Sequence, residues 1–190
     1  LEAFRSAGYH VPHPCVLNAA DFGLPQHRKR LYIVGFLERD SFERFSFPMK
    51  GAAPRRTFGD IRERKVDESY YIKPNRVANL IAHRIDQFHK NNGFGYKVTL
   101  DSDLVRTIRC GGSGLEENIV YEKTSLVLHD EWMDHPRWMT PREWARAQGF
   151  PDSFQLNPSR SAAYHQLGNS VPVTVVKAIG ESVIKALSTA

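Results

Sequence analysis

The sequence is poor in cysteine and lacks the spacings typical of zinc sites. Its two cysteines, Cys15 and Cys110, lie far apart, and neither a Cys-x-x-Cys nor a His-Glu-x-x-His spacing accompanies its eight histidines. A disulfide scaffold or a metal site is therefore not expected, and a reducing, cytoplasmic setting is. No apolar run approaches the roughly 20 residues of a membrane-spanning helix, and no signal-peptide pattern opens the chain, so no membrane partner is expected.

Composition and charge leave the function open. Hydrophobic residues make up 41% of the 190 residues, which is enough to bury a core in one large domain or two small ones. Lys and Arg together number 26 against 21 for Asp and Glu, which gives a net charge of +5. Such a charge favours a polyanionic partner, but it also suits many ordinary soluble proteins.

The N-terminal region indicates a helix followed by two strands. Residues 1–8 read as the last turns of a helix that stops at Gly8, and because the first residue is not Met, we expect the chain to begin partway through a larger fold. Strands are predicted at residues 16–17 and at residues 30–36, where a nearly continuous apolar run favours a sheet covered on both faces. This order is typical of the trailing edge of an α/β sheet.

The middle of the chain has a different composition. From about residue 45 to residue 74 it is rich in charge, Pro and Gly, so we place a domain boundary near Pro48. Apolar residues at helical spacing predict an amphipathic helix over residues 75–90. Short strands are expected at residues 98–100 and 104–109, before a glycine-rich loop.

Two further helices are expected near the C-terminus. Thr140 and Glu143 form a capping box, Pro141 stands in the first turn, and Gly149 supplies a left-handed stop. Residues 173–187 carry one broad apolar face. Helix caps of this kind occur in any soluble protein and do not indicate a function by themselves.

Three segments carry longer patterns. They are Gln-x-Arg-x-Arg at residues 26–30, the tract around the capped helix at residues 137–151, and Leu-Gly-Asn-Ser-Val-Pro at residues 167–172. In this order, with a long variable stretch between the first two, they resemble the eighth, ninth and tenth conserved blocks of DNA (cytosine-5) methyltransferases. The resemblance covers both ends of the chain, and the middle lies where that family has its target recognition domain.

The resemblance implies an α/β fold in which trailing strands and a terminal helix belong to a Rossmann-like methyltransferase sheet. It adds a small, irregular, mixed target recognition domain. We expect residues 1–47 to be the C-terminal strands of the catalytic domain, residues 48–160 to be the recognition domain, and residues 161–190 to return to the catalytic domain. Trp144 and Phe150 of the ninth block are expected to pack.

The eighth block implies residues that support catalysis. By resemblance, Arg30 donates to O2 of the target cytosine, Arg28 steadies neighbouring catalytic groups or a phosphate, and Gln26 has a supporting role. Arginine suits this task because its planar fork donates hydrogen bonds without losing its charge. The alternative is that both arginines are solvated charges that flank a strand.

The tenth block implies a cofactor site for S-adenosyl-L-methionine at Asn169, Ser170 and Val171. These residues precede a helix, whose positive N-terminal end favours the carboxylate of a methionine group. Capping of that helix by Asn169 or Ser170 is the structural alternative, and both readings can hold together.

Residues 106–112 resemble the recognition loop of the family, in which a Thr precedes an aliphatic residue. Arg109 could donate two hydrogen bonds to guanine, and Arg106 could neutralise a phosphate, although a basic loop residue more often contacts the DNA backbone or solvent. Glycines let the backbone approach a groove closely. The residues assigned to DNA binding are Arg106, Thr107, Arg109, Gly111 and Gly112.

Other parts of the family pattern do not occur in the sequence. The nucleophile of the family lies in Pro-Cys-Gln, its acid in Glu-Asn-Val, and its cofactor loop in Phe-x-Gly-x-Gly, and none of these strings is found. Cys15 lies in a strand immediately before the eighth block, and Cys110 lies in the recognition loop, so neither is expected to be the nucleophile.

We therefore expect the C-terminal part of an enzyme of restriction–modification type that methylates C5 of a flipped cytosine. Its partners would be double-stranded DNA and an N-terminal catalytic half, in the cytoplasm and at the nucleoid if the host is bacterial. Two alternatives stay open. One is a non-enzymatic DNA-binding module that keeps the recognition domain, and the other is a remnant that is only structurally stable.

Overall fold

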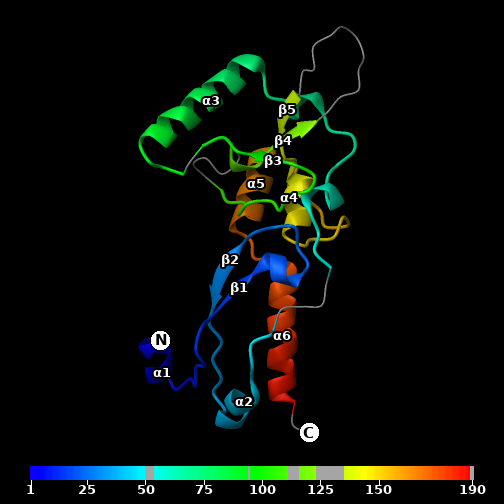
Figure 1. Ribbon diagram of the computed structural model, residues 1–190. Coiled ribbons are helices and arrows are strands. Elements are labelled where there is room, and N and C mark those ends of the chain that lie inside the picture. Colours follow the sequence, from blue (N-terminus) through cyan, green and yellow to red (C-terminus); the bar gives the residue numbers. More distant parts are fainter. Residues whose placement is uncertain (50–53, 94, 111–115, 123–134, 189–190) are drawn as a thin grey trace.

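The computed structural model describes residues 1–49, 54–93, 95–110, 116–122 and 135–188. The chain forms two parts that lie end to end: residues 1–49 and the C-terminal helix make up one, and the helices and strands between them make up the other (Figure 1). Among these residues, no helix is both long enough and apolar enough to cross a membrane.

The first part is a β-hairpin that packs on the terminal helix. It contains α1 (Glu2–Ser6), β1 (Cys15–Asn18), η1 (Ala19–Phe22), β2 (Lys29–Tyr32), α2 (Arg39–Arg44) and α6 (Val173–Leu187). Strands β1 and β2 are antiparallel. Leu17 and Tyr32 face a cluster that includes Val175 and Ile179 of α6, so the apolar face predicted for the terminal helix is confirmed and covers the hairpin.

The opposite face of the hairpin is uncovered within the described chain. Val16 and Leu31 are register partners, and each is 59% exposed. Strand β2 is also shorter than predicted, and Phe36 instead forms an isolated bridge with His10. Prolines explain the shortening, because the β1 register continued backwards would set Pro12 and Pro14 opposite residues 33–35, and proline has no N–H for the ladder.

The second part surrounds a small mixed sheet. Strand β3 (Val98–Thr99) is parallel to β4 (Ile119–Glu122), which is antiparallel to β5 (His135–Trp138). The elements around this sheet are η2 (Phe58–Asp60), η3 (Glu68–Tyr70), α3 (Pro74–His89), η4 (Glu116–Asn118), α4 (Pro141–Ala147) and α5 (Arg160–Asn169). The amphipathic helix predicted over residues 75–90 is confirmed as α3, which lies at the edge of the molecule (Figure 1).

The strand predicted at residues 104–109 is wrong. The segment is extended but forms only an isolated parallel bridge between Val105 and Gln26. Its backbone groups are bonded elsewhere: the N–H of Arg106 donates to the side chain of Asn118 at 2.8 Å, and the N–H of Val105 donates to the carbonyl of Pro25 at 2.8 Å. These partners come from a side chain and from the other part of the molecule, so no ladder forms.

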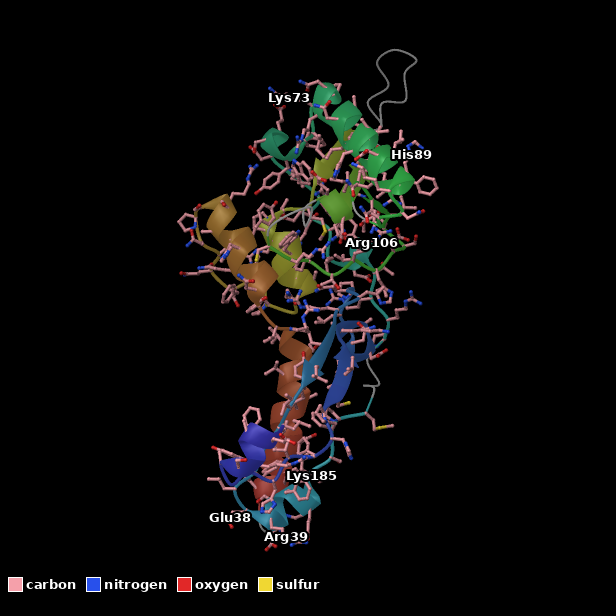
Figure 2. All side chains as sticks on the ribbon, turned by 90° about the vertical axis from the view of Figure 1, so that its left-hand side faces the viewer. Glu38, Arg39, Lys73, His89, Arg106 and Lys185 are labelled. Carbon is pink, nitrogen blue, oxygen red and sulfur yellow. The ribbon has the colours of Figure 1, made fainter. Side chains whose placement is uncertain are left out.

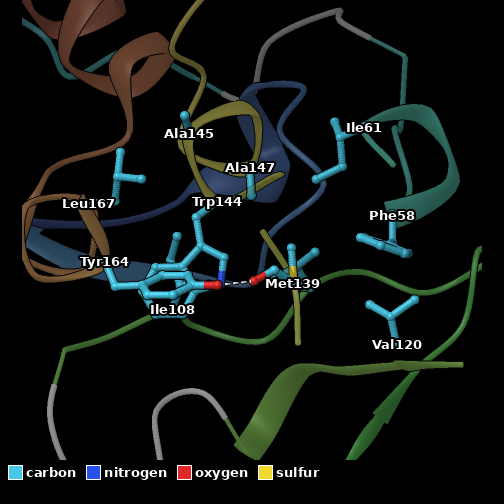
Figure 3. Packing of buried hydrophobic residues seen from close by; sticks show 11 residues of the cluster. Phe58, Ile61, Ile108, Val120, Met139, Trp144, Ala145, Ala147, Tyr164 and Leu167 are labelled. Carbon is cyan, nitrogen blue, oxygen red and sulfur yellow. Dashed lines mark hydrogen bonds between the residues drawn. The ribbon is translucent and has the colours of Figure 1, made fainter. Parts of the chain in front are cut away.

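The largest hydrophobic cluster lies between α4, α5 and the mixed sheet (Figure 3). Trp144 is 1% exposed, and its ring meets the ring of Tyr164 edge-on at 4.7 Å between centroids. The hydroxyl of Tyr164 donates to the carbonyl of Met139. Phe150 packs against the same cluster, so the packing role predicted for Trp144 and Phe150 is confirmed.

A single carboxylate fixes the start of α4. The predicted capping box is confirmed: the N–H of Glu143 donates to Thr140 Oγ1 at 3.1 Å, and the N–H of Thr140 donates to the Glu143 carboxylate at 2.9 Å. Both oxygens of Glu143 also accept from Arg137, at 2.8 and 2.9 Å, and both side chains are fully buried. The N–H of Glu63 donates to the same carboxylate at 3.0 Å. Strand β5, helix α4 and the segment before η3 therefore meet at Glu143.

Replacing Glu143 by Gln should strongly destabilise the chain. The substitution keeps the shape of the side chain but leaves the Arg137 guanidinium buried without its counter-charge, a loss of about 3–5 kcal/mol. Urea denaturation should show this loss as a lower midpoint at an unchanged slope. Glu43→Gln is the control, because it removes an exposed i,i+4 ion pair with Arg39, and we expect the midpoint to stay where it is. A loss below about 1 kcal/mol for Glu143→Gln would contradict the central role of the pair.

Candidate functional site

The two parts of the molecule meet where the loop before β2 lies beside residues 105–108. The N–H of His27 donates to the carbonyl of Val105 at 2.8 Å, and the Thr107 hydroxyl donates to the carbonyl of His27 at 2.6 Å. The N–H of Ile108 donates to the side-chain oxygen of Gln26 at 3.1 Å. The start of the first motif, Gln26 and His27, is therefore bonded to residues 105–108, which include the first part of the predicted recognition segment (residues 106–112).

Gln26 is fully buried in this junction. Its amide nitrogen donates to the carbonyl of Ala147 at 3.0 Å, which is the last residue of α4. Gln148 continues the connection, because its amide donates to the carbonyl of Leu167 at 3.0 Å and its carbonyl accepts from the N–H of Val173 at 2.9 Å. Two glutamines thus join the eighth, ninth and tenth blocks through buried hydrogen bonds.

Arg28 makes the second connection. Only 4% of the residue is exposed, and its guanidinium donates to three backbone carbonyls, those of Ile108, Gly168 (3.1 Å) and Ser170 (2.8 Å). Its Nε atom is buried and has no hydrogen-bond partner among the described residues. Burial, together with the nearby charge of Arg30, lowers the pKa of Arg28 to about 10, so it remains protonated at neutral pH. The alternative reading of Arg28 as a solvated charge is wrong.

Arg30 lies in a different environment. It is half-buried in β2, and its Nη1 donates to the carbonyl of Lys29 at 2.8 Å. Within the described chain, its Nε and Nη2 atoms have no partner. Of the two arginines in the block, Arg28 is fully engaged in structure, and Arg30 keeps donors for another molecule.

The tenth block packs directly on the recognition segment. A Cβ atom on Gly168 would lie 2.4 Å from the backbone nitrogen of Cys110, so only glycine allows this approach. The Cys110 thiol donates to the side-chain oxygen of Asn169 at 3.0 Å. Neither cysteine of the chain forms a disulfide.

Asn169 and Ser170 precede a helix as expected, but the alternative that one of them caps this helix is wrong. Asn169 is the last residue of α5, and the N-cap position of α6 is Pro172, which offers no side-chain cap. The hydroxyl of Ser170 donates to the carbonyl of Leu167 at 2.7 Å, and it therefore serves the C-terminal end of α5. Helix α5 has no clear apolar periodicity in its sequence, so its C-terminal end is not predictable from the sequence pattern. Val171, the third residue assigned to the cofactor, is 52% exposed.

The residues assigned to DNA binding divide into engaged and accessible ones. Arg106 is half-buried, and its Nη1 donates to the carbonyl of Val98 at 3.0 Å and to the carbonyl of Glu117 at 3.4 Å. Arg109 is exposed and donates to the Glu117 carboxylate at 2.8 Å. Gly111 and Gly112 lie outside the described residues.

Arg106, Thr107 and Arg109 share one open depression of about 470 Å³, which is also lined by His27, Gly93 and Glu117. In Figure 2, Arg106 lies between α3, whose ends are marked by Lys73 and His89, and the hairpin part of the molecule. The sequence patterns did not single out His27 or Glu117. The alternation of side chains along the eighth block could have indicated that His27 is accessible, because Gln26 and Arg28 are buried and His27, between them, is exposed.

No group of three or more His, Cys, Asp or Glu side chains that could hold a metal ion occurs in the part of the chain that the structure describes. The donors at the junction are amides, guanidinium groups and hydroxyls. These groups suit anionic and polar organic ligands better than metal ions.

Comparison with known proteins agrees with the resemblance in the motifs. A family model described as C-5 cytosine-specific DNA methylase matches residues 1–185. The chain is 40% identical over 188 residues to the type II methyltransferase M.HpaII of Haemophilus parainfluenzae, covering 95% of this chain and 52% of that protein. It is 39% identical over 189 residues to M.NlaX of Neisseria lactamica, covering 99% of this chain and 56% of the relative. The chain thus spans about half the length of the curated relatives it matches.

Solved structures share the fold. The Entamoeba histolytica methyltransferase EhMeth superposes with a TM-score of 0.72 at 17% identity, over 99% of this chain and 57% of that one. The S. pombe Dnmt2 methyltransferase superposes with a TM-score of 0.70 at 20% identity, over 98% of this chain and 60% of that one. The mixed α/β arrangement of hairpin, small sheet and terminal helix is therefore the one found in methyltransferases with a Rossmann-like fold.

Two glycine substitutions should change stability in opposite directions. Gly180 lies in α6 with nothing within 4 Å of an added Cβ atom, so Gly180→Ala should raise the free energy of unfolding by about 0.5–1 kcal/mol. Gly168→Ala has the same helical advantage in α5, but it must displace the backbone of Cys110, and we expect a net loss of about 1–3 kcal/mol. Chemical denaturation of both variants measures the sign of each change in the free energy of unfolding. Equal stabilisation by the two alanines would mean that the junction is not tightly packed.

Proposed function

This chain belongs to the C-5 cytosine-specific DNA methylase family, and we propose that it supplies DNA recognition and part of the cytosine and cofactor sites of a DNA (cytosine-5) methyltransferase. One observation carries the proposal. The guanidinium of Arg28 binds the recognition segment at Ile108 and the tenth block at Gly168 and Ser170. The residues assigned to DNA, cytosine and cofactor are therefore neighbours at one junction.

Arg30 is the residue we assign to the target base. It follows Arg28 by two positions in β2, and its unpartnered Nε and Nη2 atoms can donate to cytosine O2. A fixed positive donor at this oxygen stabilises the charge that develops when a nucleophile adds to the ring. Base flipping, which brings the cytosine to such a site, costs a few kcal/mol and is offset by contacts to the pocket and the DNA.

The tenth block fits a polar cofactor. Asn169, Ser170 and Val171 would hold S-adenosyl-L-methionine, which supplies the methyl group when it is bound. Val171 is exposed, and the hydroxyl of Thr174, in the first turn of α6, is buried without a partner among the described residues. An unsatisfied hydroxyl beside an exposed segment at a helix N-terminus supports a polar ligand there.

The nucleophile would come from an N-terminal catalytic half. Cys15 lies in β1 opposite Tyr32, and the Cys110 thiol is bonded to Asn169, so neither is free at the junction. The exposed hairpin face at Val16 and Leu31 supports such a partner, because apolar side chains on an uncovered sheet favour a covering layer. A double-stranded DNA substrate would locate the enzyme in the cytoplasm, at the nucleoid if the host is bacterial.

A mixing experiment tests the proposal. The chain is incubated with labelled S-adenosyl-L-methionine and duplex DNA, alone and together with the N-terminal half of M.HpaII, and incorporation of label into cytosine is measured. We expect methylation only in the mixture, and none when the catalytic cysteine of the added half is replaced by Ser. Methylation by the chain alone would contradict the assignment of the nucleophile to the other half.

The same assay separates the alternatives. DNA binding by the chain without turnover in any mixture would favour a non-enzymatic DNA-binding module. Neither binding nor turnover would favour a structural remnant.

Arg30→Ala should reduce turnover far more than it reduces DNA affinity. Loss of one donor to a developing charge lowers the rate by about 100- to 1000-fold, whereas a residue that does not contact phosphates should change DNA affinity by less than about threefold. Steady-state methylation and DNA binding by the reconstituted enzyme measure the two effects. Lys29→Ala is the matched control, because Lys29 is the exposed neighbour in β2, and its loss should leave turnover nearly unchanged. Normal turnover of Arg30→Ala would remove Arg30 from the site.

A further inference from the structure

Glu117 is the one carboxylate among the described residues that line the depression, which also contains Arg106 and Arg109. Only 11% of its side chain is exposed, and its Oε1 accepts from Arg109 Nη2 at 2.8 Å. The ammonium group of Lys97 lies 3.7 Å from the same oxygen. Arg106 and His27 also line the depression. Two cations therefore share one acidic side chain where the proposed function sets DNA.

A carboxylate is unfavourable in a surface that only attracts phosphates. Each negative charge there repels the DNA backbone and offsets one of the contacts that release counterions. Glu117 is favourable, however, if its task is to orient a cation, because an unrestrained arginine side chain loses rotamer freedom when it binds. The presence of Glu117 therefore indicates that Arg109, the arginine bonded to it, contacts a base rather than the DNA backbone.

The contact leaves the reading edge of Arg109 available. The bond to Glu117 uses one hydrogen of Nη2, and the other donors of the Arg109 guanidinium have no partner among the described residues. The second hydrogen of Nη2 and one on Nη1 can therefore donate in parallel to O6 and N7 of a guanine. An arginine held on one side and open on the other is prepared for this bidentate contact.

The backbone that carries Glu117 is itself fixed. The carbonyl of Glu116 accepts from the N–H of Lys97 at 2.9 Å, and the N–H of Ile119 donates to the carbonyl of Lys97 at 3.0 Å. Asn118 is 1% exposed, and its side chain accepts from the N–H of Arg106 at 2.8 Å. The backbone around Glu117 is therefore bonded to the same segment that carries Arg109. A precise contact with a base requires such fixed positions.

We propose that Glu117 is a specificity-determining positioning residue, which holds Arg109 in the orientation that reads a guanine of the recognised sequence. This inference rests on the proposed function, because it requires the depression to face DNA. It assigns discrimination between bases to the pair of Arg109 and Glu117, and general affinity to the remaining cations.

A selection experiment tests the pair without knowledge of the recognised sequence. The full chain is equilibrated with duplexes that carry randomised positions, the bound fraction is sequenced, and affinities are then measured for the most enriched duplex and for its single-base variants. Glu117→Gln should weaken binding to the enriched duplex by about 5- to 10-fold and relax the preference at one guanine. It should at the same time strengthen binding to unrelated duplexes, because a negative charge is lost.

Two comparisons isolate the effect. Glu116→Gln removes the same charge from the adjacent residue, whose carboxylate faces Arg76 and His83 of α3 at 3.6 Å each, and it should strengthen binding to all duplexes with the base preference intact. Arg109→Ala should abolish the preference at the same guanine, and adding Glu117→Gln to it should change the base preference no further, since the two residues read the base as one unit. Arg109→Lys, which keeps the charge but lacks the planar fork, should lose the preference and keep general affinity.

Several outcomes would overturn the inference. If Glu117→Gln behaves like Glu116→Gln, Glu117 contributes only charge. If Glu117→Gln weakens binding to every duplex equally, its role is in packing. If Glu117→Gln does not fold, as judged by circular dichroism, Arg109→Lys becomes the test. A base preference that survives Arg109→Lys would then contradict the inference. If the unsubstituted chain binds DNA but enriches no sequence, this inference is contradicted and the proposed function is not. If the chain binds no DNA, the proposed DNA-recognition function itself is contradicted.

Discussion

The buried guanidinium of Arg28 is the contact on which the junction depends. A buried cation normally needs a carboxylate, yet every acceptor that the structure gives to Arg28 is a backbone carbonyl. The position of Gly168 explains how this is tolerated. The last carbonyls of α5 lack intrahelical partners and form the negative end of the helix dipole, so they supply partial negative charge where Arg28 needs it. The carbonyls at the end of α5 thus gain hydrogen-bond donors, and the Arg28 guanidinium gains acceptors.

The eighth block thus uses identical side chains for different tasks. Gln26 and Arg28 are buried and bonded to segments far away in the sequence, whereas Arg30 is half-buried and keeps free donors. The degree of burial decides which arginine is structural and which keeps free donors. Once Arg28 is enclosed by the recognition segment and the tenth block, it is unable to reach a substrate without breaking the junction. The block therefore joins the two parts of the molecule through Gln26 and Arg28 and leaves Arg30 with free donors in β2.

Local patterns predicted what local physics controls. The capping box at Thr140, the amphipathic α3 and the apolar face of α6 all follow from neighbouring residues, and all were predictable. Features fixed by distant contacts were not. Helix α5 is held by packing on α4 rather than by its own periodicity, and Val105 is extended because it bonds to Pro25. Glu117 gave no signal, because its meaning comes only from its proximity to Arg109.

The geometry also limits where recognition can vary. Val105 and Ile108 are fully buried in the main core, and the backbone at Cys110 leaves no room for a side chain on Gly168. A change at these positions would disturb the junction that holds this segment against the eighth and tenth blocks. Thr107 and Arg109 alternate with the buried pair and line the open depression. Under the proposed function, different DNA sequences would be read by changing the exposed residues of this segment, while its buried residues keep it in place against the tenth block.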